Sequence, residues 1–198
     1  MITASMVKQL RDRTGAGIMD CKKALTECDG DLEKAIEVLR KKGASAVAKR
    51  VGRVAKEGII ASYIHPGDKL GVLVELNCET DFVARTEVFR KFARDIAMQV
   101  AAADPLVIQR EAIAKERLEK ERDVYRERAR NEGKPEKIIE RIVEGRLQKY
   151  YQEVCLLEQP FIKDPDQTIQ EVLMDISAKL GEHIVIGRFS RFRLGEED

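Results

Sequence analysis

Tryptophan is absent from this chain, histidine occurs only twice, and no apolar run approaches the roughly 18 to 20 residues that a membrane span requires. The cysteines form no C-x-x-C pair, which argues against a zinc site or a redox motif, and we expect them to be reduced packing residues. A phosphate-binding loop and a G-x-S-x-G nucleophile elbow are also missing. These absences disfavour an enzyme, and we expect neither a cofactor nor a bound metal.

The charges of the chain nearly cancel, since 36 basic residues stand against 35 acidic ones and the formal net charge is +1. Such a mixed surface is typical of solubility and ion-pair networks. An RNA-binding protein is an alternative that would use basic residues 44–53 and a later arginine-rich segment. Acidic residues interleave with those basic ones, however, and no aromatic platform accompanies them. We expect a cytoplasmic protein without direct binding to nucleotide, nucleic acid or membrane.

Helical spacing dominates the first part of the chain. Apolar residues recur three to four positions apart in three runs within residues 3–42, which predicts three short helices. Asp31 is suited to cap the third helix, and we expect Gly43 to end it. Residues 44–53 then predict a short, basic, helical connector. Residues 1–54 are therefore predicted to form a three-helix domain with its connector.

From residue 55 onward the pattern indicates strands as well as helices. Alternating apolar residues around a Pro-Gly-Asp turn at 66–68 predict a β-hairpin, and Thr80 is suited to cap the helix that follows. Residues 109–154 predict an antiparallel helical hairpin, and residues 183–194 read as the last strand. The expected fold class of residues 55–198 is α+β: one small antiparallel sheet with helices on one face and the helical hairpin inserted.

Four longer motifs point to a known family. LRDRTGAGIMDCKKAL at 10–25 and ELNCETDFVAR at 75–85 resemble the two signatures of elongation factor Ts. LLEQPFIKD at 156–164 and RFSRFRLGE at 188–196 resemble the core and tail of that family, so the resemblance covers essentially the whole chain. It implies a guanine-nucleotide exchange factor without a catalytic site of its own, which promotes GDP release from elongation factor Tu during translation elongation.

The resemblance assigns a role to four consecutive residues. In the family a TDFV segment wedges into the partner near its magnesium ion, and here that segment is Thr80, Asp81, Phe82 and Val83. Burial of Phe82 would supply roughly 1.5 to 3 kcal/mol, and Asp81 would disturb the water network of the magnesium. The alternative is structural: Thr80 caps a helix, Asp81 favours its positive end, and the two apolar residues pack at home.

The resemblance also assigns partner contacts to the first three helices, whose glycine loop and spacing resemble ubiquitin-associated folds. The candidate contacts are Arg11, Ile18, Met19 and Lys22. Met19 is the strongest of these, because a flexible thioether at a loop-to-helix junction suits an interface. The alternatives are that Ile18 belongs to the core and that Lys22 is a solvated charge.

Other interpretations account for less of the sequence. A ubiquitin-type or peptide-binding adaptor would explain the first helices but leaves residues 75–85 unexplained. An enzyme is disfavoured further because His65, in the hairpin turn, and His183, near a strand start, occupy positions typical of structural histidines. Longer members of the family carry a duplicated core, whereas this sequence contains one unit. A homodimer formed through the core sheet is therefore a hypothesis.

Overall fold

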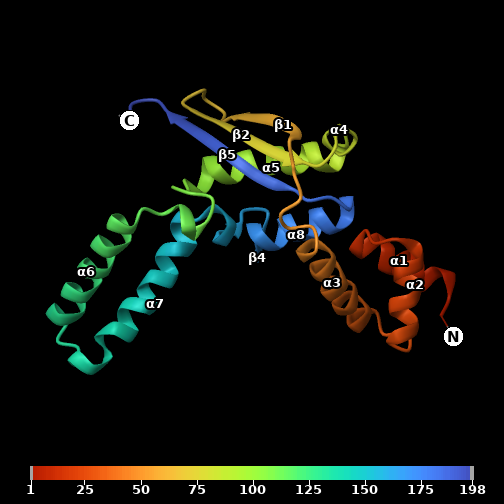
Figure 1. The fold of residues 1–198 in the computed structure, drawn as a ribbon, viewed down its shortest axis with the longest axis horizontal. Helices are drawn as coiled ribbons and strands as arrows, with labels where there is room; N and C mark the ends of the chain where they lie inside the picture. The colour runs from red at the N-terminus through yellow and green to blue at the C-terminus, as the bar shows by residue number, and fades with distance from the viewer. Residues whose placement is uncertain (1, 197–198) are drawn as a thin grey trace. The chain divides into compact units, whose positions relative to one another are not determined.

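The computed structural model describes residues 2–196. Its elements in that range are α1 (Ala4–Thr14), α2 (Ile18–Glu27), α3 (Leu32–Ala48), β1 (Glu57–Ile64), β2 (Leu70–Cys78), α4 (Asp81–Ala84), α5 (Glu87–Ala103), α6 (Lys115–Asn131), α7 (Glu136–Val154), β3 (Pro160–Phe161), β4 (Asp164–Thr168), α8 (Ile169–Leu180) and β5 (Val185–Arg193), with 3-10 turns at Arg110–Ala112 and Leu156–Glu158 (Figure 1). They confirm the α+β fold class.

The chain divides into two compact units, each built from segments distant in sequence. The first unit comprises Met1–Ile59, Leu76–Phe92 and Leu173–Val185, and the second comprises Ile60–Glu75, Ala93–Val172 and Ile186–Asp198. The sheet and the helices α5 and α8 each contribute residues to both units. The boundary expected near residue 54 stays a prediction.

The three expected helices form a bundle within the first unit. The side chain of Thr3 accepts a hydrogen bond from the Met6 amide (3.3 Å) at the start of α1, and Asp31 accepts one from the Lys34 amide (3.1 Å) at the start of α3. These caps satisfy amides that lack a partner within their own helix. The bundle core consists of six buried side chains: Leu10, Cys21, Ala24, Leu25, Ala35 and Leu39.

The prediction that Gly43 ends the third helix is wrong, because α3 continues to Ala48. A Cβ atom added at Gly43 would lie 3.2 Å from the Cβ of Ala178 on α8, tighter than ordinary contact. Gly43 therefore stands in the helix to allow a close approach of α8, and the helix tolerates it at a cost of about 1 kcal/mol relative to alanine. The helical character expected after Gly43 is present as far as Ala48.

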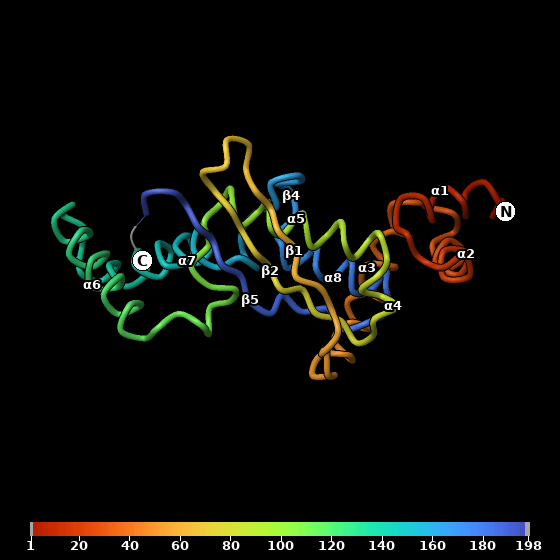
Figure 2. Tube along the Cα trace, turned by 90° about the horizontal axis from the view of Figure 1, so that it is seen from above, coloured from red at the N-terminus to blue at the C-terminus, as the bar shows by residue number. Residues whose placement is uncertain are grey.

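The three-stranded sheet has the order β1-β2-β5 and is antiparallel (Figures 1 and 2). The His65 amide donates to the Leu70 carbonyl (2.9 Å) where the hairpin closes, and the Leu194 amide donates to the Lys69 carbonyl (2.8 Å) beside β5. Every second residue of β2, from Val72 to Cys78, is buried. One face of the sheet therefore belongs to the core, and helix α5 runs along it in Figure 1.

The helical hairpin is confirmed as α6 and α7, which pack along their lengths in the second unit. Its buried stripe includes Ile139, whereas the neighbouring Ile138 is half-buried. Four arginine–glutamate pairs cross between the helices or over their turn: Arg122–Glu144 at 3.4 Å, Arg126–Glu140 at 2.7 Å, Arg130–Glu136 at 2.7 Å and Arg146–Glu132 at 2.8 Å.

A small second sheet was not expected from the sequence. Strands β3 and β4 pair antiparallel, with Pro160 opposite Thr168 and Phe161 opposite Asp164. A capping box follows at the start of α8: the Glu171 amide donates to the Thr168 hydroxyl (3.2 Å), and the Thr168 amide donates to the Glu171 carboxylate (2.9 Å). Among the described residues no helix is both long enough and apolar enough to cross a membrane.

Candidate functional site

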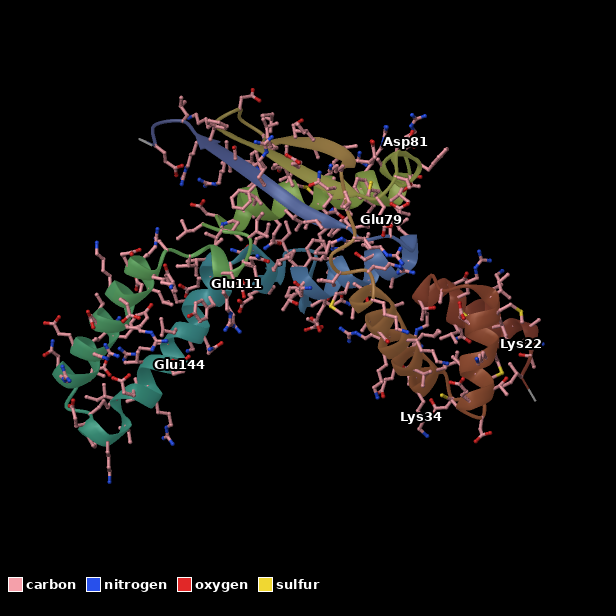
Figure 3. All side chains as sticks on the ribbon, viewed as in Figure 1. Lys22, Lys34, Glu79, Asp81, Glu111 and Glu144 are labelled. Carbon is pink, nitrogen blue, oxygen red and sulfur yellow. The ribbon has the colours of Figure 1, made fainter. Side chains whose placement is uncertain are left out.

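The candidate site begins at the sharp corner between β2 and α4. Strand β2 ends at Cys78, and α4 is a four-residue helix that begins at Asp81. Thr80 has extended backbone angles, and its hydroxyl lies 3.5 Å from the Val83 amide, which is the N-cap position expected from the sequence. Figure 3 labels Glu79 and Asp81 on the two sides of this corner.

The corner presents Phe82 to solvent. Its exposed fraction is 77%, whereas Ala84 is buried and Val83 is half-buried. The structural alternative, in which Phe82 packs in the core, does not apply. The ring is therefore accessible to a partner, and aromatic side chains are enriched in protein interfaces.

The carboxylate of Asp81 is already engaged within α4. Its Oδ2 lies 2.8 Å from the Arg85 guanidinium, one helical turn further on, and 44% of the Asp81 side chain is exposed. Exposed pairs of this kind contribute between zero and about 1 kcal/mol. The ion pair with Arg85 therefore orients Asp81 but contributes little free energy, so Asp81 can exchange Arg85 for another electrostatic partner.

Two carboxylates join the corner to the loop between α8 and β5, within the first unit. Glu182 accepts hydrogen bonds from the Glu79 amide (3.0 Å), the Thr80 amide (3.1 Å) and the Thr80 hydroxyl (2.6 Å). In the other direction, Glu79 accepts a bond from the His183 amide (2.7 Å), which holds the pKa of Glu79 below its ordinary value. Sequence analysis missed both carboxylates because their partners lie 102 to 104 residues away.

The buried Cys78 thiol also forms a hydrogen bond within the corner. Cys78 is fully buried, and its Sγ donates to the Thr80 carbonyl at 3.1 Å. Burial raises the pKa of this thiol to about 11, and the nearby Glu182 carboxylate adds to the effect. The thiol therefore stays protonated at neutral pH and behaves as a packing residue. Cys21, Cys28 and Cys155 are likewise free of disulfides.

The four candidate residues of the first helices are all exposed. Arg11 lies on α1, while Ile18, Met19 and Lys22 lie on α2, where Figure 3 labels Lys22. The exposed fractions are 55% for Ile18 and 73% for Met19. The alternative that placed Ile18 in the core is wrong, because the buried residues of α2 are Cys21, Ala24 and Leu25.

The two histidines of the chain make structural contacts. The ring of His65 hydrogen-bonds the Tyr63 hydroxyl (3.0 Å), and that of His183 hydrogen-bonds the Arg53 carbonyl (2.9 Å). Both contacts fit the structural roles expected for the two histidines. Within residues 2–196 no group of three or more His, Cys, Asp or Glu side chains is placed to hold a metal ion.

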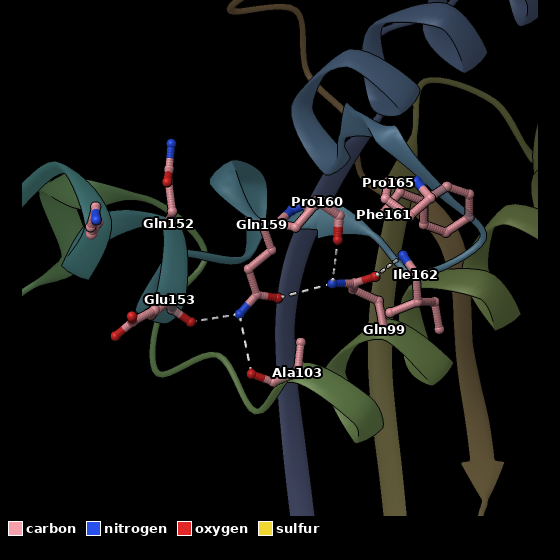
Figure 4. A pocket seen from close by; sticks show the side chains of 10 residues that line it. Gln99, Ala103, Gln152, Glu153, Gln159, Pro160, Phe161, Ile162 and Pro165 are labelled. Atoms are coloured by element: carbon pink, nitrogen blue, oxygen red, sulfur yellow. Dashed lines mark hydrogen bonds between the residues drawn. The ribbon is translucent and has the colours of Figure 1, made fainter.

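A groove in the second unit has a volume of about 610 Å³ and lies beside a buried amide pair (Figure 4). Gln99 Nε2 donates to Gln159 Oε1 (3.1 Å) and to the Pro160 carbonyl (3.2 Å), while the Ile162 amide donates to Gln99 Oε1 (2.9 Å). These bonds satisfy the buried amides and fix α5 to β3.

The sheet face opposite α5, termed here the open face, carries four exposed apolar residues in the second unit: Ile60 at 68%, Ile64 at 59%, Leu73 at 47% and Phe192 at 64% exposed. Ile64 of β1 lies beside Gly71 of β2: a Cβ atom added to Gly71 would lie 3.0 Å from the Cδ1 atom of Ile64. The Arg188–Glu75 ion pair (2.7 Å) borders the same face. The open face is thus an apolar surface with a charged edge.

Comparison with known proteins identifies the family. Residues 3–196 match the family model described as elongation factor TS. The chain is 61% identical to elongation factor Ts of Desulforamulus reducens over 98% of this chain and 90% of that protein, and 61% identical to elongation factor Ts of Carboxydothermus hydrogenoformans over 99% and 90%. It is 59% identical to elongation factor Ts of Caldanaerobacter subterraneus over 99% of this chain and 98% of that protein. The chain belongs to the elongation factor Ts family.

Proposed function

We propose that this protein is a guanine-nucleotide exchange factor for elongation factor Tu, that it acts in the cytoplasm, and that it has no catalytic site of its own. Membership of the elongation factor Ts family supports the proposal. The observation that carries it is the 77% exposure of Phe82 at the corner formed by the second signature motif. A phenylalanine with this exposure is available for a partner to cover, and it stands within the motif through which the resemblance implies contact with elongation factor Tu.

The wedge mechanism follows from the residue types at the corner. Bound GDP and magnesium stabilise each other, because the cation bridges phosphate oxygens and requires near-octahedral geometry with several waters. Insertion of Phe82 would release roughly 1.5 to 3 kcal/mol through burial of its ring. Asp81 would leave Arg85 and enter the water network of the magnesium, while Thr80 and Val83 hold the segment in place. Loss of the magnesium geometry then loosens the nucleotide.

A second contact would come from the three-helix bundle. Arg11, Ile18, Met19 and Lys22 are exposed on α1 and α2 and would bind the GTPase domain away from its magnesium site. Ile18 and Met19 would supply the apolar centre of this contact, and the two cations would lie around it. This second contact would keep the proteins associated while the wedge acts.

The test is the release of labelled GDP from elongation factor Tu with and without this protein. We expect faster release, and a nucleotide-free complex that added GDP dissociates. Reciprocity requires the second result, because a factor that weakens nucleotide binding must itself be weakened by the nucleotide to the same degree. A complex equally tight with and without saturating magnesium-GDP would refute the mechanism. Salt-dependent filter binding to RNA would reveal the RNA-binding alternative.

A homodimer is the second part of the proposal. The open face would bind the same face of another copy, because two such faces bury the exposed Ile60, Ile64, Leu73 and Phe192 side chains against one another in a sandwich. The dimer should survive reducing agent, since residues 183–194 contain no cysteine. Sedimentation at micromolar concentration, for the free protein and for the complex, measures it directly; monomer alone in both would remove the dimer.

A further inference from the structure

One carboxylate from a distant segment holds the corner that carries Phe82. Glu182 follows α8 in the sequence, and its Oε2 accepts the amides of Glu79 (3.0 Å) and Thr80 (3.1 Å). Both amides come after the last residue of β2, where strand pairing stops. A backbone amide that loses its strand partner needs another acceptor, and Glu182 supplies a charged one.

The second oxygen of Glu182 controls the hydroxyl of Thr80. A threonine hydroxyl has one hydrogen to donate and two lone pairs that accept. Here the hydrogen is donated to Glu182 Oε1 at 2.6 Å, which turns the oxygen lone pairs toward the Val83 amide at 3.5 Å. The bond to the carboxylate is short and the capping contact is long, so Glu182 is the stronger determinant of the hydroxyl orientation.

A bond in the opposite direction, from the loop after α8 to Glu79, strengthens the connection between this loop and the corner. Glu79 Oε1 accepts the His183 amide at 2.7 Å, and Glu79 Oε2 lies 3.3 Å from the Arg53 guanidinium. Neighbouring residues of the two loops therefore exchange carboxylate-to-amide bonds in both directions. The three such bonds between these loops restrain rotation of the corner more than one bond would, because each fixes a different backbone atom.

We propose that Glu182 is a positioning residue for nucleotide exchange: acting through Thr80, its carboxylate holds the Thr80–Val83 segment in the orientation from which Phe82 enters the partner. The inference rests on the proposed function. A helix of four residues makes too few internal hydrogen bonds to fix its own direction, and Phe82 has few contacts to anchor it. Order established before binding removes an entropic cost that binding would otherwise carry.

The experiment compares Glu182→Ala with a control, Glu132→Ala, which removes a carboxylate bonded to Arg146 in the helical hairpin. The first measurement is the maximal rate of GDP release from elongation factor Tu at saturating concentrations of each variant. We expect Glu182→Ala to lower the maximal rate at least about tenfold and to change the half-saturating concentration less, because α1 and α2 still bind. Glu132→Ala should keep the full rate, and Glu182→Gln should restore part of it.

The second measurement reports the orientation directly and does not depend on exchange. The chain contains no tryptophan, so Phe82→Trp places a single tryptophan at the wedge. We expect the fluorescence anisotropy at position 82 to fall when Glu182→Ala is added and to stay unchanged with Glu132→Ala. Thr80→Val should reproduce most of the effect, and adding Glu182→Ala to it should have a less than additive effect.

The outcomes separate this inference from the function on which it rests. Full release rate and unchanged anisotropy in Glu182→Ala would overturn the positioning role, even with Phe82→Ala defective. An intact release rate in Phe82→Ala would instead refute the wedge, and a fall in anisotropy in the same series would still show that Glu182 orders the segment. If Glu182→Ala does not fold, Glu182→Gln carries the test, since an amide has one acceptor oxygen where the carboxylate has two.

Discussion

Replacement of Phe82 by alanine should damage exchange far more than folding. Only about a quarter of this side chain is covered in the free protein, since 77% of it is exposed. We therefore expect a loss of unfolding free energy below about 1 kcal/mol. Phe89, on the next helix α5, is fully buried and provides the contrast. Its truncation to alanine should lower the free energy of unfolding by about 3 to 5 kcal/mol and threaten the fold.

The effect on exchange follows from burial in the complex. If the ring contributes about 2 kcal/mol only in the opened state, its loss slows GDP release by about thirtyfold. Leu194→Ala is the matched control, because Leu194 is also 77% exposed but lies outside the corner. The assay sets the melting temperature of each variant against its rate of labelled GDP release. A large fall in melting temperature with normal exchange by the folded fraction would refute the wedge assignment.

Three further outcomes are expected. Glu79→Gln should lower the free energy of unfolding at neutral pH. Because the pKa of Glu79 is lower in the folded protein than its ordinary value of 4.5, the difference between variant and wild type should shrink as the pH falls below 4.5 and vanish below the lowered pKa. Denaturant melts at pH 3 to 7 measure this difference, and a difference that stays constant would contradict the role of the charge. Gly145→Ala should raise stability by about 0.5 to 1 kcal/mol, because it lies in α7 with open space around it; an unchanged melting midpoint would be inconsistent with this. Phe192→Asp on the open face should convert the proposed dimer into a monomer in sedimentation and leave the proposed binding of elongation factor Tu through α1 and α2 unchanged; a persistent dimer would place the interface elsewhere.

Local chemistry allowed much of the fold to be predicted. The three helices of the bundle follow from apolar spacing and from the Asp31 cap, and the β-hairpin follows from period-two alternation around its turn. The N-cap role of Thr80 also depends only on neighbouring residues. In each case the residues that decide the structure lie within one or two turns of one another, where sequence spacing is sufficient evidence.

The features that sequence analysis missed depend on distant contacts. Gly43 is a residue type that often ends helices, yet α3 continues through it, and the close approach of Ala178 from α8 is the contact that its missing side chain permits. Strand β4 consists largely of polar residues and proline, which disfavour strands, and it pairs because the chain reverses directly after β3. The hold of Glu182 on Thr80 spans 102 residues, so no local pattern marks it.

The distribution of ion pairs and buried side chains along the hairpin α6–α7 predicts where this part of the molecule opens first. The largest buried side chains lie toward the base of α7, at Leu147, Tyr150 and Tyr151, whereas the turn around Gly133 is exposed and held by ion pairs. Ion pairs of exposed groups weaken as salt is added, but buried apolar contacts do not. Backbone amides should therefore exchange with solvent fastest at the turn and progressively more slowly toward Val154, and added salt should steepen that gradient without moving its protected end.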